Sequence, residues 1–193
     1  MDNIANQATL LYNNMTTNSN TVTTQILSLY DLTATKEALL DTYTPNQTIT
    51  YVTRVENTGS ASLYNLTVVD DLAKGLTQYI DNSVEGYLNG TPIEVNVQIT
   101  NNTVIFTIDN VINPNDNVLI IFETTTPTTR PDVLTNTQTI TANGGSTTGP
   151  IVAVTPNPSA TVTLANYVSL DITKSANKAS IYSGDTLVYT FQI

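Results

Sequence analysis

The sequence predicts an all-β protein: an immunoglobulin-like β-sandwich with extra N- and C-terminal strands from incomplete flanking repeats. Its 193 residues are rich in Thr, Asn, Val, Ile and Tyr, and only 11% are charged. Such residues suit pleated, half-buried strands and the turns between them. Short runs of alternating apolar and polar residues recur between turn signals, whereas no run of a dozen residues keeps helical spacing. These patterns favour a sandwich of about seven short strands.

An internal repeat sets the predicted organisation. The segment LTATKEALLDTYTPNQTITYVTRV, residues 32–55, corresponds without a gap to LDITKSANKASIYSGDTLVYTFQI, residues 170–193. Lys36 falls on Lys174, an offset of 174 − 36 = 138. Repetition at this scale indicates that the second segment opens another copy of the same structural unit.

A second echo lies near the N-terminus. IANQATLLYNN resembles LTNTQTITANGG, which places Asn6 on Asn136 at an offset of 136 − 6 = 130. The chain therefore combines the tail of one repeat, a whole repeat and the head of another. The expected divisions are N-terminal strands in residues 1–28, a complete sandwich in 29–142, a linker in 143–159 and the opening strands of a truncated repeat in 160–193.

Turn residues bound the expected strands of the complete repeat, which opens within residues 29–40. Asn57-Thr58-Gly59 closes one strand, and Asn89-Gly90 has the composition of a hairpin turn. Between the turns, alternation predicts strands at Thr48–Glu56, Leu63–Val69, Ile93–Ile99, Thr103–Ile108, Val118–Thr124 and Val133–Ala142. Outside this repeat, it predicts strands at Gln7–Tyr12, Thr21–Leu27, Ala160–Leu164 and Val168–Thr173, with a turn over residues 13–20.

Composition excludes several classes of function. The net charge is −10 with six Lys and Arg residues, so phosphate-rich nucleic acid is an unsuitable partner. The absence of His and Cys excludes Ser-His-Asp catalysis, disulfides and thiolate metal sites. The acidic turn residues could bind calcium, but no D-x-D-x-D-G loop occurs, which favours solvated carboxylates. We expect no conventional enzyme, no metal, no cofactor and no small-molecule substrate, and no apolar run approaches the ~20 residues of a membrane span.

Four segments occur in a characteristic order: TATKEA, VENTGSASLYNLTVVDDLAKGL, NPNDNVLIIF and LTNTQTIT. In this order they resemble the bacterial surface repeat called Domain of Unknown Function 11, which typically reads T-K, N-T-G, T-V-x-D-x-L-P-x-G-L and N-T-A-x-V. The resemblance covers residues 29–142 and part of 170–193. This chain has Ala73 where the family usually has Pro, and Asn46 where it usually has Gly, whereas Gly184 restores that glycine in the second copy.

The resemblance implies a location and an architecture. Such repeats occur in fimbrial, cell-surface and spore-surface proteins of clostridia and bacilli, and many form isopeptide bonds. The N-terminus MDNIANQATL is similar to natural N-termini of the family and lacks the basic region and apolar core of a signal peptide. We therefore expect a protein of the cell or spore surface, with a spore protein able to assemble from the mother-cell cytoplasm.

An isopeptide bond joins a Lys amine to an Asn amide and expels ammonia, and a buried neutral carboxyl group can polarise the amide carbonyl. Lys36, Asp70 and Asn136 supply this set in sequence order, with Asp70 as the autocatalytic residue and Asp71 or Glu56 as alternative carboxylates. A lysine on a half-buried strand is unusual unless it is paired or reacted. The alternative is that Lys36 points to solvent or forms a plain ion pair with Asp70.

No counterpart of Asn136 or Asp70 follows Lys174 in this sequence. We expect its partner to come from this chain's own N-terminus, from the N-terminus of a neighbouring copy or from sequence beyond Ile193. Asn6 is the candidate for an intersubunit contact. We expect a structural subunit that associates with itself head to tail into a filament, because incomplete sandwiches expose unpaired strand edges. The alternative function is an adhesin or ligand-binding module of a multi-repeat cell-surface protein.

Overall fold

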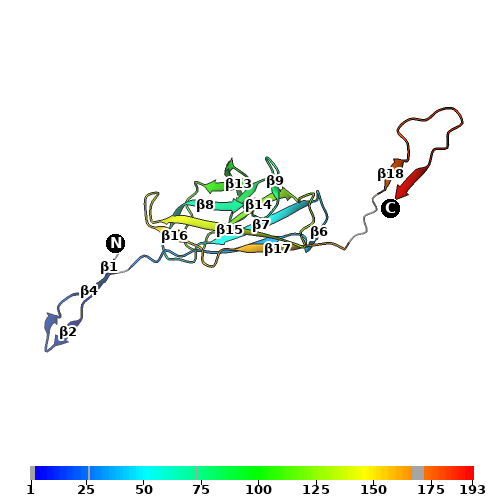
Figure 1. Ribbon diagram of the computed structural model, residues 1–193. Coiled ribbons are helices and arrows are strands. Elements are labelled where there is room, and N and C mark those ends of the chain that lie inside the picture. The colour runs from blue at the N-terminus through cyan, green and yellow to red at the C-terminus, as the bar shows by residue number, and fades with distance from the viewer. Residues whose placement is uncertain (1–2, 26, 73, 167–171) are drawn as a thin grey trace.

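The computed structural model describes residues 3–25, 27–72, 74–166 and 172–193. These residues form strands and no helix, so the expected all-β class is confirmed, and none of them could cross a membrane as a helix. The central part is an immunoglobulin-like sandwich, and hairpins extend from its two ends (Figure 1).

Two sheets face each other in the sandwich. We call the first the β7 sheet, whose strands run in the order β11 (Thr91–Ile93), β10 (Glu85–Leu88), β14 (Asn117–Thr125), β7 (Thr48–Glu56) and β5 (Thr33–Ala38), with β9 (Gln78–Tyr79) beside β14. The second is the β8 sheet, in the order β12 (Asn96–Thr100), β13 (Thr103–Ile108), β8 (Leu63–Asp71), β15 (Val133–Gly144), β17 (Ser159–Leu164) and β6 (Thr42–Tyr43), with β16 (Ile151–Ala153) beside β15. Described neighbours pair antiparallel except β17 and β6, which pair parallel.

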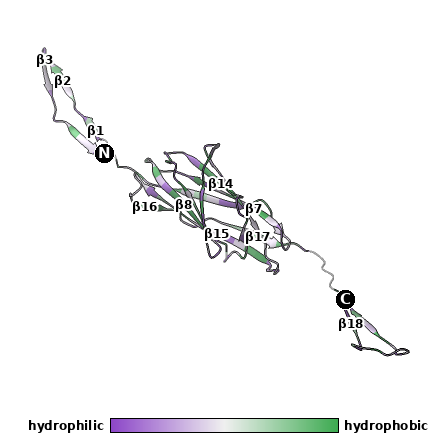
Figure 2. Ribbon diagram, turned by 90° about the horizontal axis from the view of Figure 1, so that it is seen from above, coloured by the Kyte–Doolittle hydropathy of each residue, from purple (hydrophilic) through white to green (hydrophobic). Residues whose placement is uncertain are grey.

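Strict alternation along the long strands builds the core. Every second residue of β7, β14 and β15 is buried, and β8 alternates in the same way from Leu66 onward, so each sheet presents one face inward. Figure 2 shows the corresponding changes between hydrophobic and hydrophilic residues along the strands. Aromatic rings fill the centre, where Phe122 lies 5.6 Å from Tyr51 and 5.0 Å from Phe106, measured between ring centroids.

Asparagine supplies most of the tight turns. Asn89 and Gly90 have φ angles of 50° and 80°, and they join β10 to β11 with Leu88 opposite Thr91. This is the geometry of a two-residue type I′ hairpin, so the hairpin expected from Asn-Gly is confirmed.

The segment after β15 differs from the expectation. Residues 143–159 were expected to form a linker, and residue 160 was expected to begin a truncated repeat. The structure instead pairs β16 and β17 with β15 in the β8 sheet. Ala160 and Val162 alternate into the core, and Val154 is buried beside them, so the sandwich extends to Leu164 because these apolar residues complete it.

The larger division into partial and complete repeats stays a prediction. Ala73 and residues 168–171 of the expected strand Val168–Thr173 lie outside the described residues.

Hairpins flank the sandwich on both sides. At the N-terminal side, β1 (Asn3–Asn6) pairs with β4 (Val22–Gln25), and β2 (Thr9–Tyr12) pairs with β3 (Met15–Asn18). The expected turn over residues 13–20 was too long, because Asn13 and Asn14 adopt positive φ and turn the chain within two residues. At the C-terminal side, β18 (Thr173–Ala176) pairs with β19 (Tyr189–Gln192), and all described strand residues of these hairpins are exposed.

The C-terminal hairpin reproduces a strand pair of the sandwich. Lys174 lies opposite Phe191 as Lys36 lies opposite Thr53, and both differences are 138 (174 − 36 and 191 − 53). The pair β18–β19 is therefore a second copy of β5–β7 in the same register.

The N-terminal pair β1–β4 likewise reproduces β15–β17. Asn6 lies opposite Val22 as Asn136 lies opposite Ala160, at offsets of 136 − 6 = 130 and 160 − 22 = 138. The two offsets differ because the connection between the paired strands is shorter in the N-terminal copy.

Candidate crosslinking site

A lysine side chain lies between the two sheets of the sandwich. Lys36 is an inward-facing residue of β5, and its side chain is fully buried. Its Nζ lies 2.7 Å from Oδ2 of Asp70, an equally buried residue of β8. Because β5 and β8 belong to different sheets, this ion pair joins the two layers.

Two amides from β15 meet the same carboxylate oxygen. Asn136 Nδ2 lies 3.3 Å from Asp70 Oδ2, and Gln138 Nε2 lies 2.9 Å from it. Gln138 is the direct cross-strand neighbour of Asp70, while Asn136 precedes it by two residues and so shares its inward face. Within the described part of the chain, Asp70 Oδ1 and Asn136 Oδ1 have no hydrogen-bond partner.

The amide orientation differs from the sequence-based expectation. A neutral Asp70 was expected to polarise the Asn136 carbonyl, yet the nitrogen of the amide faces the carboxylate. With Asp70 ionised, this is the favourable orientation, because a carboxylate accepts hydrogen bonds and an N–H donates them.

Aromatic rings enclose the lysine. Nζ of Lys36 lies 4.7 Å from the ring centroid of Tyr51 and 5.0 Å from that of Phe122. Ring faces attract a cation and also exclude water from it. The amine therefore lies in an apolar environment, and Asp70 is its charged partner.

Burial shifts the titration of this cluster. Desolvation lowers the pKa of Lys36 from 10.5 to about 8, against the opposing effect of the Asp70 charge and hydrogen bond. Burial and the Asp70 charge raise the pKa of Tyr51 to about 12, with the Asn136 side chain acting in the opposite direction. The neutral amine, which is the nucleophilic form, is thus far more accessible than in an exposed lysine.

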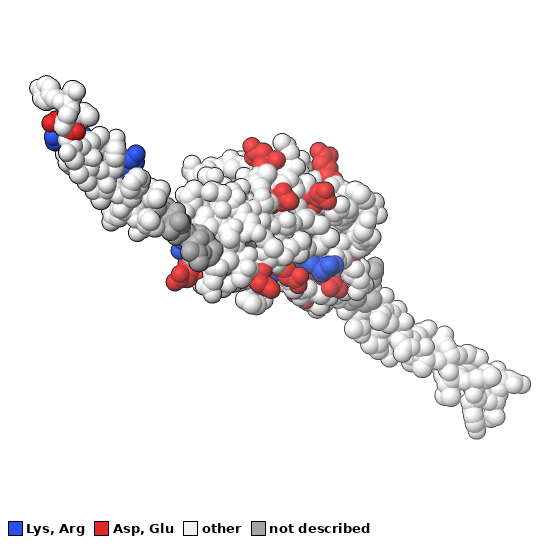
Figure 3. Space-filling model, turned by 90° about the vertical axis from the view of Figure 1, so that its right-hand side faces the viewer, with Lys and Arg blue, Asp and Glu red and all other residues white. Residues whose placement is uncertain are grey.

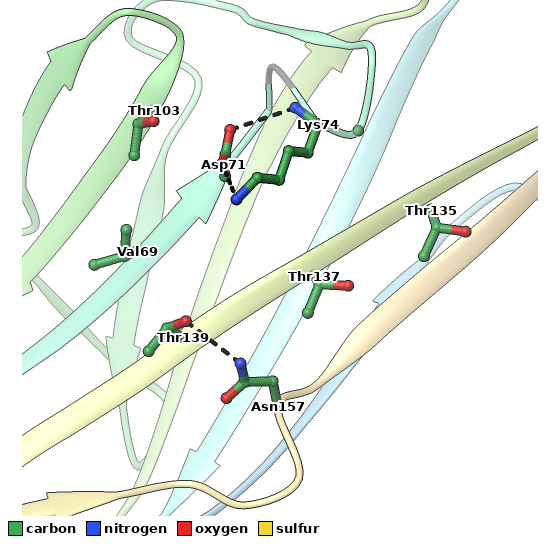
Figure 4. Close-up of a pocket in the computed structure, with 9 residues that line it drawn as sticks. Val69, Asp71, Lys74, Thr103, Thr135, Thr137, Thr139 and Asn157 are labelled. Atoms are coloured by element: carbon green, nitrogen blue, oxygen red, sulfur yellow. Dashed lines mark hydrogen bonds and ion pairs between the residues drawn. The ribbon is translucent and has the colours of Figure 1, made fainter.

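The structure brings together Lys36, Asp70 and Asn136 but neither alternative carboxylate. Asp71 lies on the outer face of β8, where Lys74 Nζ approaches it at 2.9 Å (Figure 4). Glu56 is exposed at the end of β7. Alternation along strands explains both placements, because neighbours on a strand point to opposite faces.

The two candidate intersubunit residues are apart within one chain. Asn6 is exposed on β1 and Lys174 is exposed on β18, on opposite sides of the sandwich (Figure 1). Lys174 Nζ lies 4.0 Å from the ring centroid of Tyr189, the repeat counterpart of Tyr51 (189 − 51 = 138). The environment of the first lysine is therefore partly copied around the second.

Sequence reasoning missed Gln138 and Thr53. The Thr53 hydroxyl donates to Gln138 Oε1 at 2.7 Å, which makes a second polar link between the sheets. Their spacing in the sequence indicates that both face inward. Gln138 lies two residues from Asn136, and Thr53 lies midway between the inward-facing residues Tyr51 and Val55 of β7.

The remaining surface offers less chemistry. A hollow of about 380 Å³ on the outer face of the β8 sheet is lined by Val69, Asp71, Lys74, Gly75, Thr103, Thr135, Thr137, Thr139 and Asn157 (Figure 4). None of these described lining residues is aromatic. Acidic side chains are scattered over the face shown in Figure 3, and no described group of three or more acidic residues could hold a metal ion.

The comparisons with known proteins place the fold. No family model matches the chain, and no curated protein matches its sequence. Among solved structures, the model is similar to BcpA, the major pilin subunit of Bacillus cereus, with a TM-score of 0.54 and 12% identity over 82% of this chain and 47% of that one. It is similar to BcpA carrying D312A, with a TM-score of 0.58 and 11% identity over 96% of this chain and 60% of that one.

A third similarity is to the full-length major pilin SpaD of Corynebacterium diphtheriae, with a TM-score of 0.52 and 16% identity over 67% of this chain and 33% of that one. The chain has a pilin-like fold. It spans between a third and three fifths of the length of these pilins, and identities this low establish the shared fold alone.

We predict that Asp70→Ala destabilises the fold far more than Asp71→Ala. Without Asp70 the Lys36 charge is buried and uncompensated, which costs about 3–5 kcal/mol, whereas an exposed pair is worth about 0–1 kcal/mol. Urea unfolding of both variants measures the difference. Both should carry Asn136→Ala as well, so that the predicted covalent bond contributes to neither. Equal losses would show that the buried pair is unimportant for folding.

Proposed function

We propose that this protein is a structural subunit of a bacterial surface fibre, either a pilus or a spore appendage, whose sandwich is closed by a Lys36–Asn136 isopeptide bond. The buried cluster of Lys36, Asp70 and Asn136 between the two sheets carries the proposal. The pilin-like fold and the resemblance to Domain of Unknown Function 11 support it. No other enzymatic activity is proposed.

The geometry around Asp70 suits the required proton transfers. The Lys36 ammonium gives one proton to Asp70 Oδ2, 2.7 Å away, which leaves a neutral amine and a neutral carboxyl group. The amine attacks Cγ of Asn136, and a new C–N bond forms as the bond to Nδ2 breaks. A second proton passes from the attacking nitrogen through the carboxyl group to Nδ2, which lies 3.3 Å from Oδ2, so that ammonia leaves.

The product removes the electrostatic problem of the reactants. After ammonia leaves, Lys36 is part of a neutral amide and Asp70 retains the first proton, so no charge remains buried. The carboxyl O–H then needs an acceptor. A candidate is Oδ1 of Asn136, which has no partner among the described residues and belongs to the amide that contacts Asp70. The bond would also close a loop of 136 − 36 = 100 residues, worth on the order of 5 kcal/mol in the chain-entropy model.

Strand complementation between subunits is the second part of the proposal. The hairpins carry exposed apolar side chains, including Ile4, Val22, Tyr189 and Phe191. The pair β1–β4 copies the closing strands β15–β17, and β18–β19 copies the opening strands β5–β7. Closing strands from one copy and opening strands from the next can therefore face each other, as β15–β17 faces β5–β7 across the sandwich.

In such a junction Asn6 of one copy would approach Lys174 of its neighbour, as Asn136 approaches Lys36. Neither hairpin contains a counterpart of Asp70, which lies on β8. Non-covalent pairing needs no such group, whereas a covalent junction needs a carboxyl group from further strands. Head-to-tail contacts of this kind build open filaments, consistent with a location on the cell or spore surface.

We predict that the folded protein is lighter than its calculated mass by one ammonia molecule. Lys36→Ala should restore the full mass, because the nucleophile is lost. Lys178→Ala is the control, since Lys178 lies on the exposed C-terminal hairpin and pairs with Asp185, and it should keep the deficit. Intact mass spectrometry under denaturing conditions measures all three, and a full mass for the unaltered protein would disprove the bond.

We predict that crosslinking slows at high pH. The reactive pair needs a neutral amine and a protonated carboxyl group, hence one shared proton. The pair loses that proton as the pH rises through the lowered pKa of Lys36, which is about 8. The rate should be level from about pH 7 to 8 and fall roughly tenfold per pH unit above it.

The measurement is ammonia loss over time after dilution of unfolded, uncrosslinked protein into refolding buffer. A rate that rises through pH 8 would mean that only deprotonation of Lys36 limits the reaction and that Asp70 supplies no proton.

We predict filaments that lengthen with protein concentration in electron micrographs. Phe191→Ser should weaken them by removing an exposed apolar contact of β19, while Ile151→Ser, at an exposed site on the sandwich, should not. Boiling in SDS separates subunits that are joined by strand pairing alone. Bands that survive boiling and disappear in Lys174→Ala would report a covalent junction, and a monodisperse monomer at all concentrations would contradict self-assembly.

A further inference from the structure

Two chemically equivalent amides lie beside one lysine and one acid. Asn136 and Gln138 are both buried on β15, and both donate to Asp70 Oδ2. Either carboxamide could in principle be attacked by an amine with loss of ammonia. The Gln138 nitrogen is the nearer of the two to the carboxylate, at 2.9 Å against 3.3 Å. Proximity to Asp70 therefore does not select Asn136.

The carbonyl groups of these amides differ in their partners. Gln138 Oε1 accepts a hydrogen bond from the Thr53 hydroxyl at 2.7 Å, whereas Asn136 Oδ1 has no partner among the described residues. Thr53 is itself fully buried, and it lies directly opposite Lys36 in the β5–β7 ladder. The Gln138 amide is thus held at both ends, by Thr53 of the β7 sheet and Asp70 of the β8 sheet.

This double restraint decides which amide can react. Attack at a carboxamide requires the amide carbon to move into contact with the amine nitrogen. For Gln138, this movement would break its hydrogen bonds to both Thr53 and Asp70 in a buried site. The Asn136 amide is held by one hydrogen bond, from Nδ2 to Asp70 Oδ2 at 3.3 Å, so its carbon can approach the Lys36 nitrogen at a lower cost.

We propose that Thr53 and Gln138 form a positioning pair that confines the crosslink to Asn136 and keeps the acid in place. The inference rests on the proposed Lys36–Asn136 bond. In the reaction, the Lys36 nitrogen bonds to Cγ of Asn136, and Nδ2 departs as ammonia with a proton relayed by Asp70. Gln138 keeps its amide and its hydrogen bond to Asp70, so the carboxyl group retains an N–H donor when Nδ2 has gone.

The test locates the bond rather than measuring stability. In Asn136→Ala, we expect the full mass, because Thr53 keeps Gln138 unreactive. In Asn136→Ala with Thr53→Val, which removes the hydroxyl at similar volume, we expect the loss of one ammonia. Peptide fragmentation should then place the link between Lys36 and Gln138. Asn136→Ala with Thr53→Ser restores the hydroxyl and should return the full mass.

The outcomes separate the two proposals. A full mass for the unaltered protein would disprove the crosslink itself. If the unaltered protein is crosslinked, ammonia loss in Asn136→Ala overturns the restraint by Thr53. A full mass for folded Asn136→Ala/Thr53→Val, with folding checked by circular dichroism, also overturns it. If the Thr53→Val protein does not fold, Asn136→Ala alone decides whether Gln138 is excluded.

Discussion

An ammonium group buried between two sheets is the constraint on which the centre of this sandwich depends. An ammonium group left without a partner in an apolar core costs about 3–5 kcal/mol, a large part of a domain's net stability, so Lys36 depends on a charged partner. Asp70 supplies it from the opposite sheet at 2.7 Å. The rings of Tyr51 and Phe122 enclose the same nitrogen and link the polar cluster to the aromatic core. The register of β5 on β7 and of β8 on β15 must therefore be held, since a shift of one residue would turn these side chains to solvent.

Much of the architecture could be predicted from local pattern. Alternation in Thr48–Glu56 and Val118–Thr124 predicted strands that the structure contains, and Asn89-Gly90 predicted its hairpin. Strand β17 was assigned to the wrong unit, because the Gly- and Pro-rich stretch before it reads as a linker. Its place in the sheet depends on pairing with β15 across a long connection, which local pattern does not specify.

The site shows the same division between local and non-local information. Lys36, Asp70 and Asn136 could be selected because their order resembles a known motif. Thr53 and Gln138 could not, because their hydrogen bond joins residues on different sheets. In the sequence, an inward-facing polar residue is recognised where it replaces an apolar residue in the alternating pattern. Which of these polar residues contact each other depends on how the sheets are stacked.

The positions of Lys36 and Asn136 have a consequence for a chain under tension. Lys36 lies on β5, the first described strand of the sandwich in sequence, and Asn136 lies on β15, which is followed there by β16 and β17. A covalent link between them would carry force past the 136 − 36 − 1 = 99 intervening residues. At about 3.4 Å per extended residue, those residues would otherwise add roughly 340 Å of length on unfolding. A fibre built from such units would therefore resist extension, with only the segments outside the link able to lengthen under load.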